Sequence, residues 1–85
     1  MSPSDVQTKI LLYLFEKQPN PNIQLTPNMI GIEIENRELM KTFLELYKYG
    51  YISGKIQTYE DGDKELQFIK ITQSGTNFLN EKDLI

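Results

Sequence analysis

The sequence of 85 residues contains no cysteine, no histidine and no tryptophan. Without cysteine the chain cannot form a disulfide, an iron–sulfur cluster or a thiolate zinc site. Without histidine it lacks the commonest general base and the commonest metal ligand. Its longest apolar run, residues 10–15, is too short for a membrane span or a signal peptide. We therefore expect a small cytoplasmic protein that is not an enzyme and needs no metal or cofactor.

Positive charge is also scarce in this sequence. Nine Lys and Arg residues stand against 12 Asp and Glu residues, so the formal net charge is −3. Arg37 is the sole arginine. An acidic protein repels nucleic acid at long range, so binding to it would depend on a local cluster of cations. The apolar fraction of 39% is sufficient for one small core, which predicts a single domain over residues 1–85.

Capping residues predict two helices in the first third of the chain. Ser2 or Ser4 caps the first helix, which must end before Gln18 because a segment rich in proline and asparagine follows. A short second helix is predicted between a Thr26 cap and Gly31, which ends it.

The third helix, over residues 36–50, is the most clearly specified element. Apolar residues recur with helical spacing at positions 39, 40, 43, 44, 46 and 47. Asn36 is the expected N-cap, and Gly50 is expected to end the helix in the left-handed conformation.

The segment 55–71 predicts a β-hairpin, because two stretches rich in Ile, Thr, Tyr and Phe flank an Asp-Gly turn. The favoured register places Glu60 opposite Lys64 and Ile56 opposite Phe68. This register would pair opposite charges and large apolar side chains across the strands.

A short last helix is predicted to begin at Thr72 or Ser74 and to pack Phe78 and Leu79 against the core. The order of elements indicates an α+β protein of the winged helix-turn-helix type. This fold has three N-terminal helices, a β-hairpin wing and a short C-terminal helix. A plain α+β domain without the geometry of a wing is the alternative.

Three stretches of this sequence resemble a known family. They are Ile30-Gly31-Ile32, Tyr49-Gly50-Tyr51-Ile52 and Ile71-Thr72-Gln73-Ser74-Gly75-Thr76-Asn77-Phe78-Leu79. They are similar to the turn, the end of the third helix and the start of the last helix in small YjcQ-like proteins of low-GC Gram-positive bacteria and their phages. The resemblance implies a winged-helix fold and, by analogy, transcription regulation through double-stranded DNA.

The third helix carries the first candidate DNA-contacting residues. Arg37, Lys41 and Lys48 fall within about 40° of one another on a helical wheel, where they could contact phosphates. Arg37 could also bind guanine, and Asn36 could read adenine. Glu45 lies four residues after Lys41 and three before Lys48, a spacing that is also typical of an ordinary solvated face. Further hydrogen-bonding candidates are Gln24, Asn28 and Thr42.

In the hairpin, Lys55 and Lys64 are predicted to reach the flanking phosphates. Four carboxylates between positions 60 and 65 oppose this contact. They favour an alternative function, a protein–protein interaction module that does not bind DNA. Candidate residues for contact with a second copy or another protein are the tyrosines expected to be exposed, Tyr49 and Tyr59, and Leu12, expected on the outward edge of the first helix.

Overall fold

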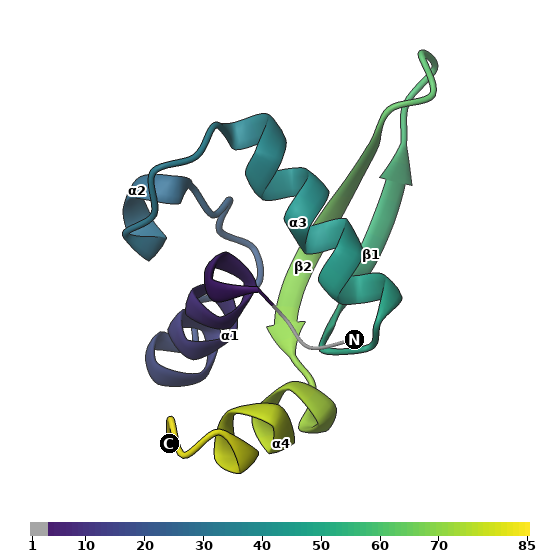
Figure 1. The fold of residues 1–85 in the computed structure, drawn as a ribbon. Coiled ribbons are helices and arrows are strands. Elements are labelled where there is room, and N and C mark those ends of the chain that lie inside the picture. The colour runs from purple at the N-terminus through teal and green to yellow at the C-terminus, as the bar shows by residue number, and fades with distance from the viewer. Residues whose placement is uncertain (1–3) are drawn as a thin grey trace.

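Helices precede and follow a single β-hairpin in the part of the chain that the structure describes, residues 4–85 of a computed structural model (Figure 1). The elements are α1 (Asp5–Lys17), α2 (Pro27–Ile30), α3 (Asn36–Lys48), β1 (Ile52–Thr58), β2 (Lys64–Ile71) and α4 (Gln73–Glu81). The predicted order and the α+β class are confirmed.

A capping box fixes the start of α1. The Ser4 hydroxyl accepts the Gln7 N–H at 3.3 Å, and the Gln7 side chain accepts the Ser4 N–H at 2.9 Å. The alternative cap, Ser2, lies outside the described residues. The helix ends before Gln18, as predicted, and Gln18 itself is left-handed with φ 43°.

The predicted bounds of α2 are confirmed, whereas the predicted cap of α3 is wrong. Thr26 Oγ1 accepts the Met29 N–H at 3.4 Å, and Gly31 ends α2 at φ +84°. For α3, Glu35 is the extended residue at the N-cap position, and its side chain forms no capping bond. Asn36 is the first helical residue, because the Leu39 N–H already donates to the Glu35 carbonyl at 3.0 Å.

Gly50 ends α3 as predicted, with φ +84°. The Gly50 N–H donates to the Tyr47 carbonyl and the Tyr51 N–H to the Leu46 carbonyl, both at 3.0 Å. This pair of bonds is a Schellman motif, whose left-handed residue glycine adopts without strain. It turns the chain directly from α3 into β1.

The hairpin loop comprises residues 60–62. The Gly62 N–H donates to the Tyr59 carbonyl at 3.0 Å, and the Tyr59 N–H donates to the Asp63 carbonyl at 2.8 Å. Gly62 has φ +88°. A three-residue loop whose last residue is left-handed is a common hairpin connection, and glycine is the residue best suited to that position.

This loop makes the predicted register wrong by two residues. Lys64 lies opposite Thr58 rather than Glu60, and Leu66 rather than Phe68 lies opposite Ile56. The glycine must occupy the last loop position, not the middle one, because only that position requires a positive φ.

Buried side chains from every element except α2 form one core. They are Ile10, Leu11, Leu14, Ile32, Leu39, Phe43, Leu46, Ile52, Leu66, Ile69, Phe78 and Leu79. Phe78 and Leu79 lie in this core as predicted. Leu12 does not point away from it, since the side chain is partly buried and packs against the cluster. Tyr51 closes one edge, with its ring centroid 5.7 Å from that of Phe78.

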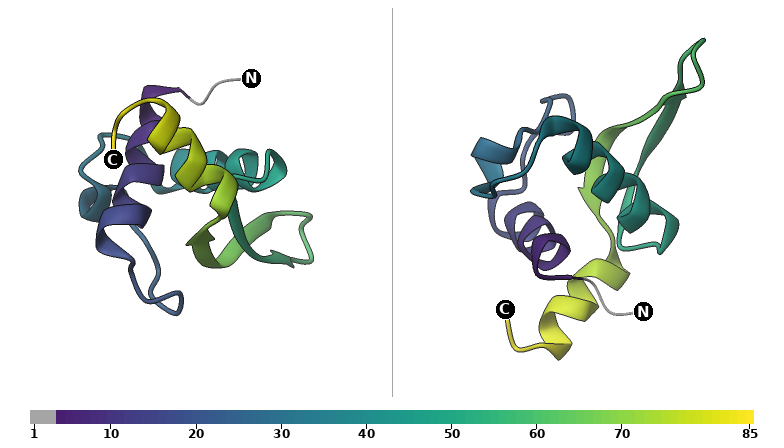
Figure 2. Two further views of the ribbon diagram at one scale, coloured as in Figure 1. Left: turned by 90° about the horizontal axis from the view of Figure 1, so that it is seen from below. Right: turned by 45° about the horizontal axis from the view of Figure 1, so that its top comes forward.

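The hairpin projects from the helical body, as two further views show (Figure 2). The Cα extents of 42 × 24 × 24 Å reflect this projection. No helix among the described residues is both long and apolar enough to cross a membrane.

Candidate nucleic-acid interface

The outward face of α3 carries three cations. Leu39, Phe43 and Leu46 are buried on the inward face. Arg37, nine residues before Leu46, lies about 180° from it around the helix axis. Arg37, Lys41 and Lys48 are all exposed, so the side chains predicted to share one face do share it and nothing in residues 4–85 covers them.

Glu45, the acidic neighbour of these cations, makes a contact with another helix. Its carboxylate accepts a hydrogen bond from Gln7 Nε2 of α1 at 3.2 Å. This bond gives the Glu45 carboxylate a partner on α1 rather than on α3. Glu38 and Glu45 both remain exposed on α3, so the solvated-face interpretation of its charges stays open.

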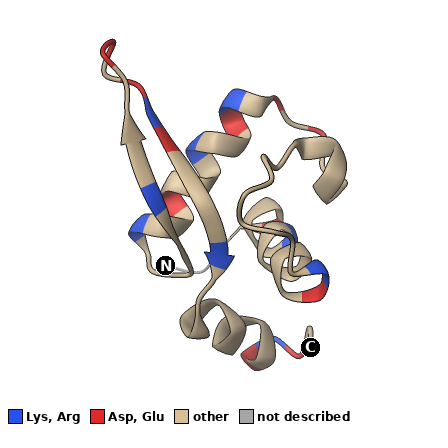
Figure 3. Ribbon diagram, turned by 180° about the vertical axis from the view of Figure 1, so that it is seen from behind, with Lys and Arg blue, Asp and Glu red and all other residues tan. Residues whose placement is uncertain are grey.

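A groove of about 630 Å³ separates the first half of α3 from the hairpin. Its cationic lining residues are Arg37 and Lys41 on the helix and Lys64 on β2, and Asn36 and Gln24 add polar side chains. Figure 3 shows the helix cations alternating with acidic positions, and the acidic tip of the hairpin beyond them. Four of the predicted DNA-contacting residues therefore meet at one groove.

Two carboxylates, Asp63 and Glu65, also line this groove. The Tyr59 hydroxyl donates a short hydrogen bond to Glu65 Oε2. This bond to Glu65 raises the pKa of the Tyr59 hydroxyl, with smaller contributions from burial and from the carboxylate charge. Tyr59 and Glu65 are thus neighbours on the hairpin side of the groove.

The remaining predicted residues lie elsewhere. Lys48 is on the same face of α3 but outside the groove. Ile56 pairs with Leu66, which is buried against the core. Lys55, the neighbour of Ile56 along the strand, therefore points to the opposite, outer face of the hairpin. Asn28 lines a separate cavity, and the Thr42 hydroxyl donates back to the Glu38 carbonyl at 2.8 Å, so Thr42 is not directed outward.

The two tyrosines expected at the surface are there, since Tyr49 and Tyr59 are each 46% exposed. Tyr59, however, belongs to the groove rather than to a separate protein-contact surface. Asp63 and Glu65, two of the four carboxylates that the sequence sets against a DNA contact of the hairpin, do line this groove. Within residues 4–85, no group of acidic side chains is arranged to hold a metal ion.

Comparison of the chain with protein-family models, with curated proteins and with solved structures gives no match. A proposal for the function therefore rests on the geometry of the α3 face and of its groove alone.

Proposed function

We propose that this chain is a winged helix-turn-helix protein that binds double-stranded DNA as a transcription regulator. In this proposal α3 enters the major groove and the β1–β2 hairpin is the wing, lying against the flanking backbone. The observation that carries the proposal is the placement of Arg37, Lys41 and Lys48 on the one face of α3 that points directly away from the core.

The net charge of −3 does not prevent such binding at moderate salt. The Debye length is about 10 Å at 0.1 M salt, so charges farther away are largely screened. Arg37 and Lys48 span about 16 Å along the helix axis, and Asp63 and Glu65 of the hairpin line the groove beside Arg37 and Lys41. Phosphates at the α3 face are therefore influenced mainly by nearby charges, which are the three cations of α3 and, at the groove, Lys64 and the opposing carboxylates of Asp63 and Glu65.

Each cation has a role suited to its chemistry. Arg37 is able to grip guanine or a phosphate with two parallel hydrogen bonds, because its guanidinium is a planar fork. Lys41 and Lys48 act as phosphate contacts, and Asn36 at the start of α3 can pair with adenine. Lys64 adds a phosphate contact from the wing.

Neutralising the helix face tests the proposal. The triple variant Arg37→Gln, Lys41→Gln, Lys48→Gln should lose binding to a mixed-sequence duplex, measured by fluorescence anisotropy at about 50 mM salt. All three side chains are exposed, so the fold should persist, which far-UV circular dichroism checks.

A charge-matched control separates a local interface from net charge. The variant Lys9→Gln, Lys17→Gln, Lys82→Gln removes three exposed cations from other helices and lowers the net charge by the same amount. It should retain most of the affinity. Equal losses in the two triple variants would contradict a specific α3 interface.

The protein–protein interaction module is kept as a second candidate on one observation. Tyr49 follows α3 directly, is 46% exposed and lies outside the groove between α3 and the hairpin. An exposed aromatic side chain at this position could anchor a protein partner. Sedimentation of the wild type and of Tyr49→Ala tests this candidate. Self-association lost in the variant would support it, whereas a monomer in both would count against it. Leu12, the third candidate contact residue, is not used as a test position, because its side chain packs against the core.

A further inference from the structure

The groove between α3 and the hairpin is lined by charges of both signs. Arg37 and Lys41 line its α3 side, whereas Asp63, Lys64 and Glu65 line the side of the hairpin. Contacts with phosphates would use the cations, but a carboxylate close to them weakens the attraction of any phosphate. The proposed phosphate contacts therefore leave the two carboxylates of this groove unexplained.

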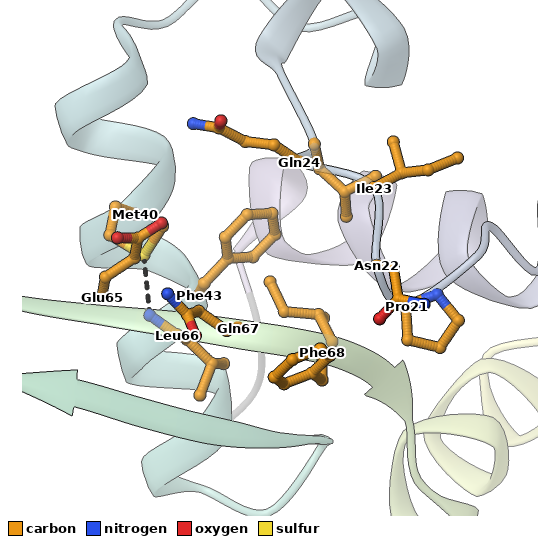
Figure 4. Close-up of a pocket in the computed structure, with 12 residues that line it drawn as sticks. Pro21, Asn22, Ile23, Gln24, Met40, Phe43, Glu65, Leu66, Gln67 and Phe68 are labelled. Atoms are coloured by element: carbon orange, nitrogen blue, oxygen red, sulfur yellow. Dashed lines mark hydrogen bonds between the residues drawn. The ribbon is translucent and has the colours of Figure 1, made fainter.

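Glu65 lies where β2 is in direct contact with α3. Its Oε2 accepts a hydrogen bond from the hydroxyl of Tyr59, a residue that lines the same groove. The next residue along β2, Leu66, directs its N–H at Met40 Sδ of α3, 3.2 Å away. Figure 4 shows this contact and the Glu65 side chain next to it. The two walls of the groove are thus joined beside Glu65.

The bond from Tyr59 leaves the Glu65 carboxylate able to accept further hydrogen bonds. An ionised carboxylate offers about four acceptor sites and no donor. A group on DNA that pairs with it must therefore carry an N–H. The phosphodiester backbone has no such donor, whereas the bases present amino groups at their edges. In the major groove these are the N4 amino group of cytosine and the N6 amino group of adenine.

Arg37, on the opposite wall of the groove, favours cytosine over adenine as the partner of Glu65. Its guanidinium matches the O6 and N7 acceptors of guanine, and cytosine is the base paired with guanine. A carboxylate matches the N4 amino group of cytosine, whereas adenine suits an amide that both donates and accepts. A guanidinium and a carboxylate in one groove therefore match the acceptors and the donor of a G·C pair.

We propose that Glu65 determines base specificity by accepting a hydrogen bond from cytosine N4 in the major groove, beside a guanine that Arg37 contacts. This inference rests on the proposed binding of DNA by α3. Tyr59 is a positioning residue, which orients the carboxylate through its hydroxyl. The negative charge of Glu65 lowers the affinity for all DNA, and a contact that only cytosine satisfies makes the binding selective.

Three duplexes of equal length test the inference by fluorescence anisotropy at about 50 mM salt. One contains only G·C pairs, one contains only A·T pairs, and the third has inosine in place of every guanine. Inosine lacks the minor-groove amino group but keeps O6 and N7 opposite an unchanged cytosine. The wild type should bind the G·C and inosine duplexes with similar affinity, and the A·T duplex about tenfold more weakly.

Glu65→Gln is the discriminating variant, because glutamine keeps the shape of the side chain but pairs with adenine. It should lower the preference for G·C over A·T about fivefold. Tyr59→Phe should lower the preference by a smaller factor, because the carboxylate remains but is no longer oriented. The matched control is Glu60→Gln, which removes an exposed carboxylate outside the groove. It should tighten binding to all three duplexes equally and leave the preference unchanged, since it changes charge alone.

Some results would overturn the inference while DNA binding by α3 stands. They are equal affinity of the wild type for the G·C and A·T duplexes, and an unchanged preference in Glu65→Gln. Weaker binding of the inosine duplex than of the G·C duplex would assign the readout to the minor-groove amino group of guanine and contradict a contact with cytosine. An absence of binding to every duplex would instead refute the proposed function, and this inference with it.

Discussion

Replacing Lys41 by glutamine tests whether the α3 face binds DNA through phosphates. Lys41 is exposed and lines the groove between α3 and the hairpin. Binding that neutralises phosphates releases counterions, so the affinity falls with salt in proportion to the number of contacts. The structure supplies four candidate contacts, Arg37, Lys41 and Lys48 on the helix and Lys64 on the hairpin.

Four contacts predict a slope of about −3.6 for the logarithm of affinity against the logarithm of salt concentration. The affinity of the wild type should then fall about 150-fold between 50 and 200 mM salt. With Lys41→Gln the slope should be about −2.7, and the fall about 40-fold. The stability of the protein should change by less than about 0.5 kcal/mol, since the side chain is at the surface.

The assay is fluorescence anisotropy of a labelled duplex at a series of salt concentrations between those limits. Lys82→Gln, at the end of α4, serves as the single-charge control and should keep the wild-type slope. A slope near zero in the wild type, or the same slope in both variants, would refute the assignment of Lys41 as a phosphate contact.

Three further outcomes concern the fold. The hydrogen bond to Glu65 raises the pKa of Tyr59 above 10.0, so the unfolded chain loses this proton first and folding stability should decrease as the pH rises above 10. Urea unfolding at a series of pH values should show this decrease in the wild type and less of it in Tyr59→Phe. Gly75→Ala should cost about 1–3 kcal/mol in urea unfolding, since the added Cβ would lie 2.7 Å from Ile71 Cγ1; an unchanged midpoint would contradict the close packing. Phe68→Gly should be more stable than Phe68→Ala by about 1 kcal/mol, and a less stable glycine variant would mean that the left-handed backbone is not strained.

Local signals in the sequence were sufficient to predict most helix bounds. Thr26, Thr72, Gly31 and Gly50 act within one helical turn of their own positions, through a hydroxyl that accepts an N–H or a glycine that adopts a positive φ. Asn36 was misplaced because Glu35, directly before it, could also take the extended cap conformation. Which of two such neighbours is the N-cap depends on where the backbone changes from the extended to the helical conformation.

The residues of the two strands do not by themselves determine the register of the hairpin. Pairing of opposite charges favoured Glu60 with Lys64, but the position of Gly62 in the loop outweighs a single exposed ion pair. A shift by two residues keeps each side chain on its face. For this reason Lys64 still meets the groove, although its neighbours were mispredicted.

The Phe68 bulge could not have been predicted from the sequence. A large aromatic residue strongly disfavours a positive φ, so strand alternation is the natural expectation there. The bulge brings Ile69 into the core, and that gain depends on contacts with residues far away in the chain.

Chemical-shift mapping with a mixed-sequence duplex at about 50 mM salt tests DNA binding by α3 most directly. The amides of residues 36–48 and of Lys64 should shift in a saturable manner, and the shifts should decrease when the salt concentration is raised. Unchanged signals along α3, or shifts confined to α1 and α4, would contradict the proposal that the exposed cations of α3 bind DNA.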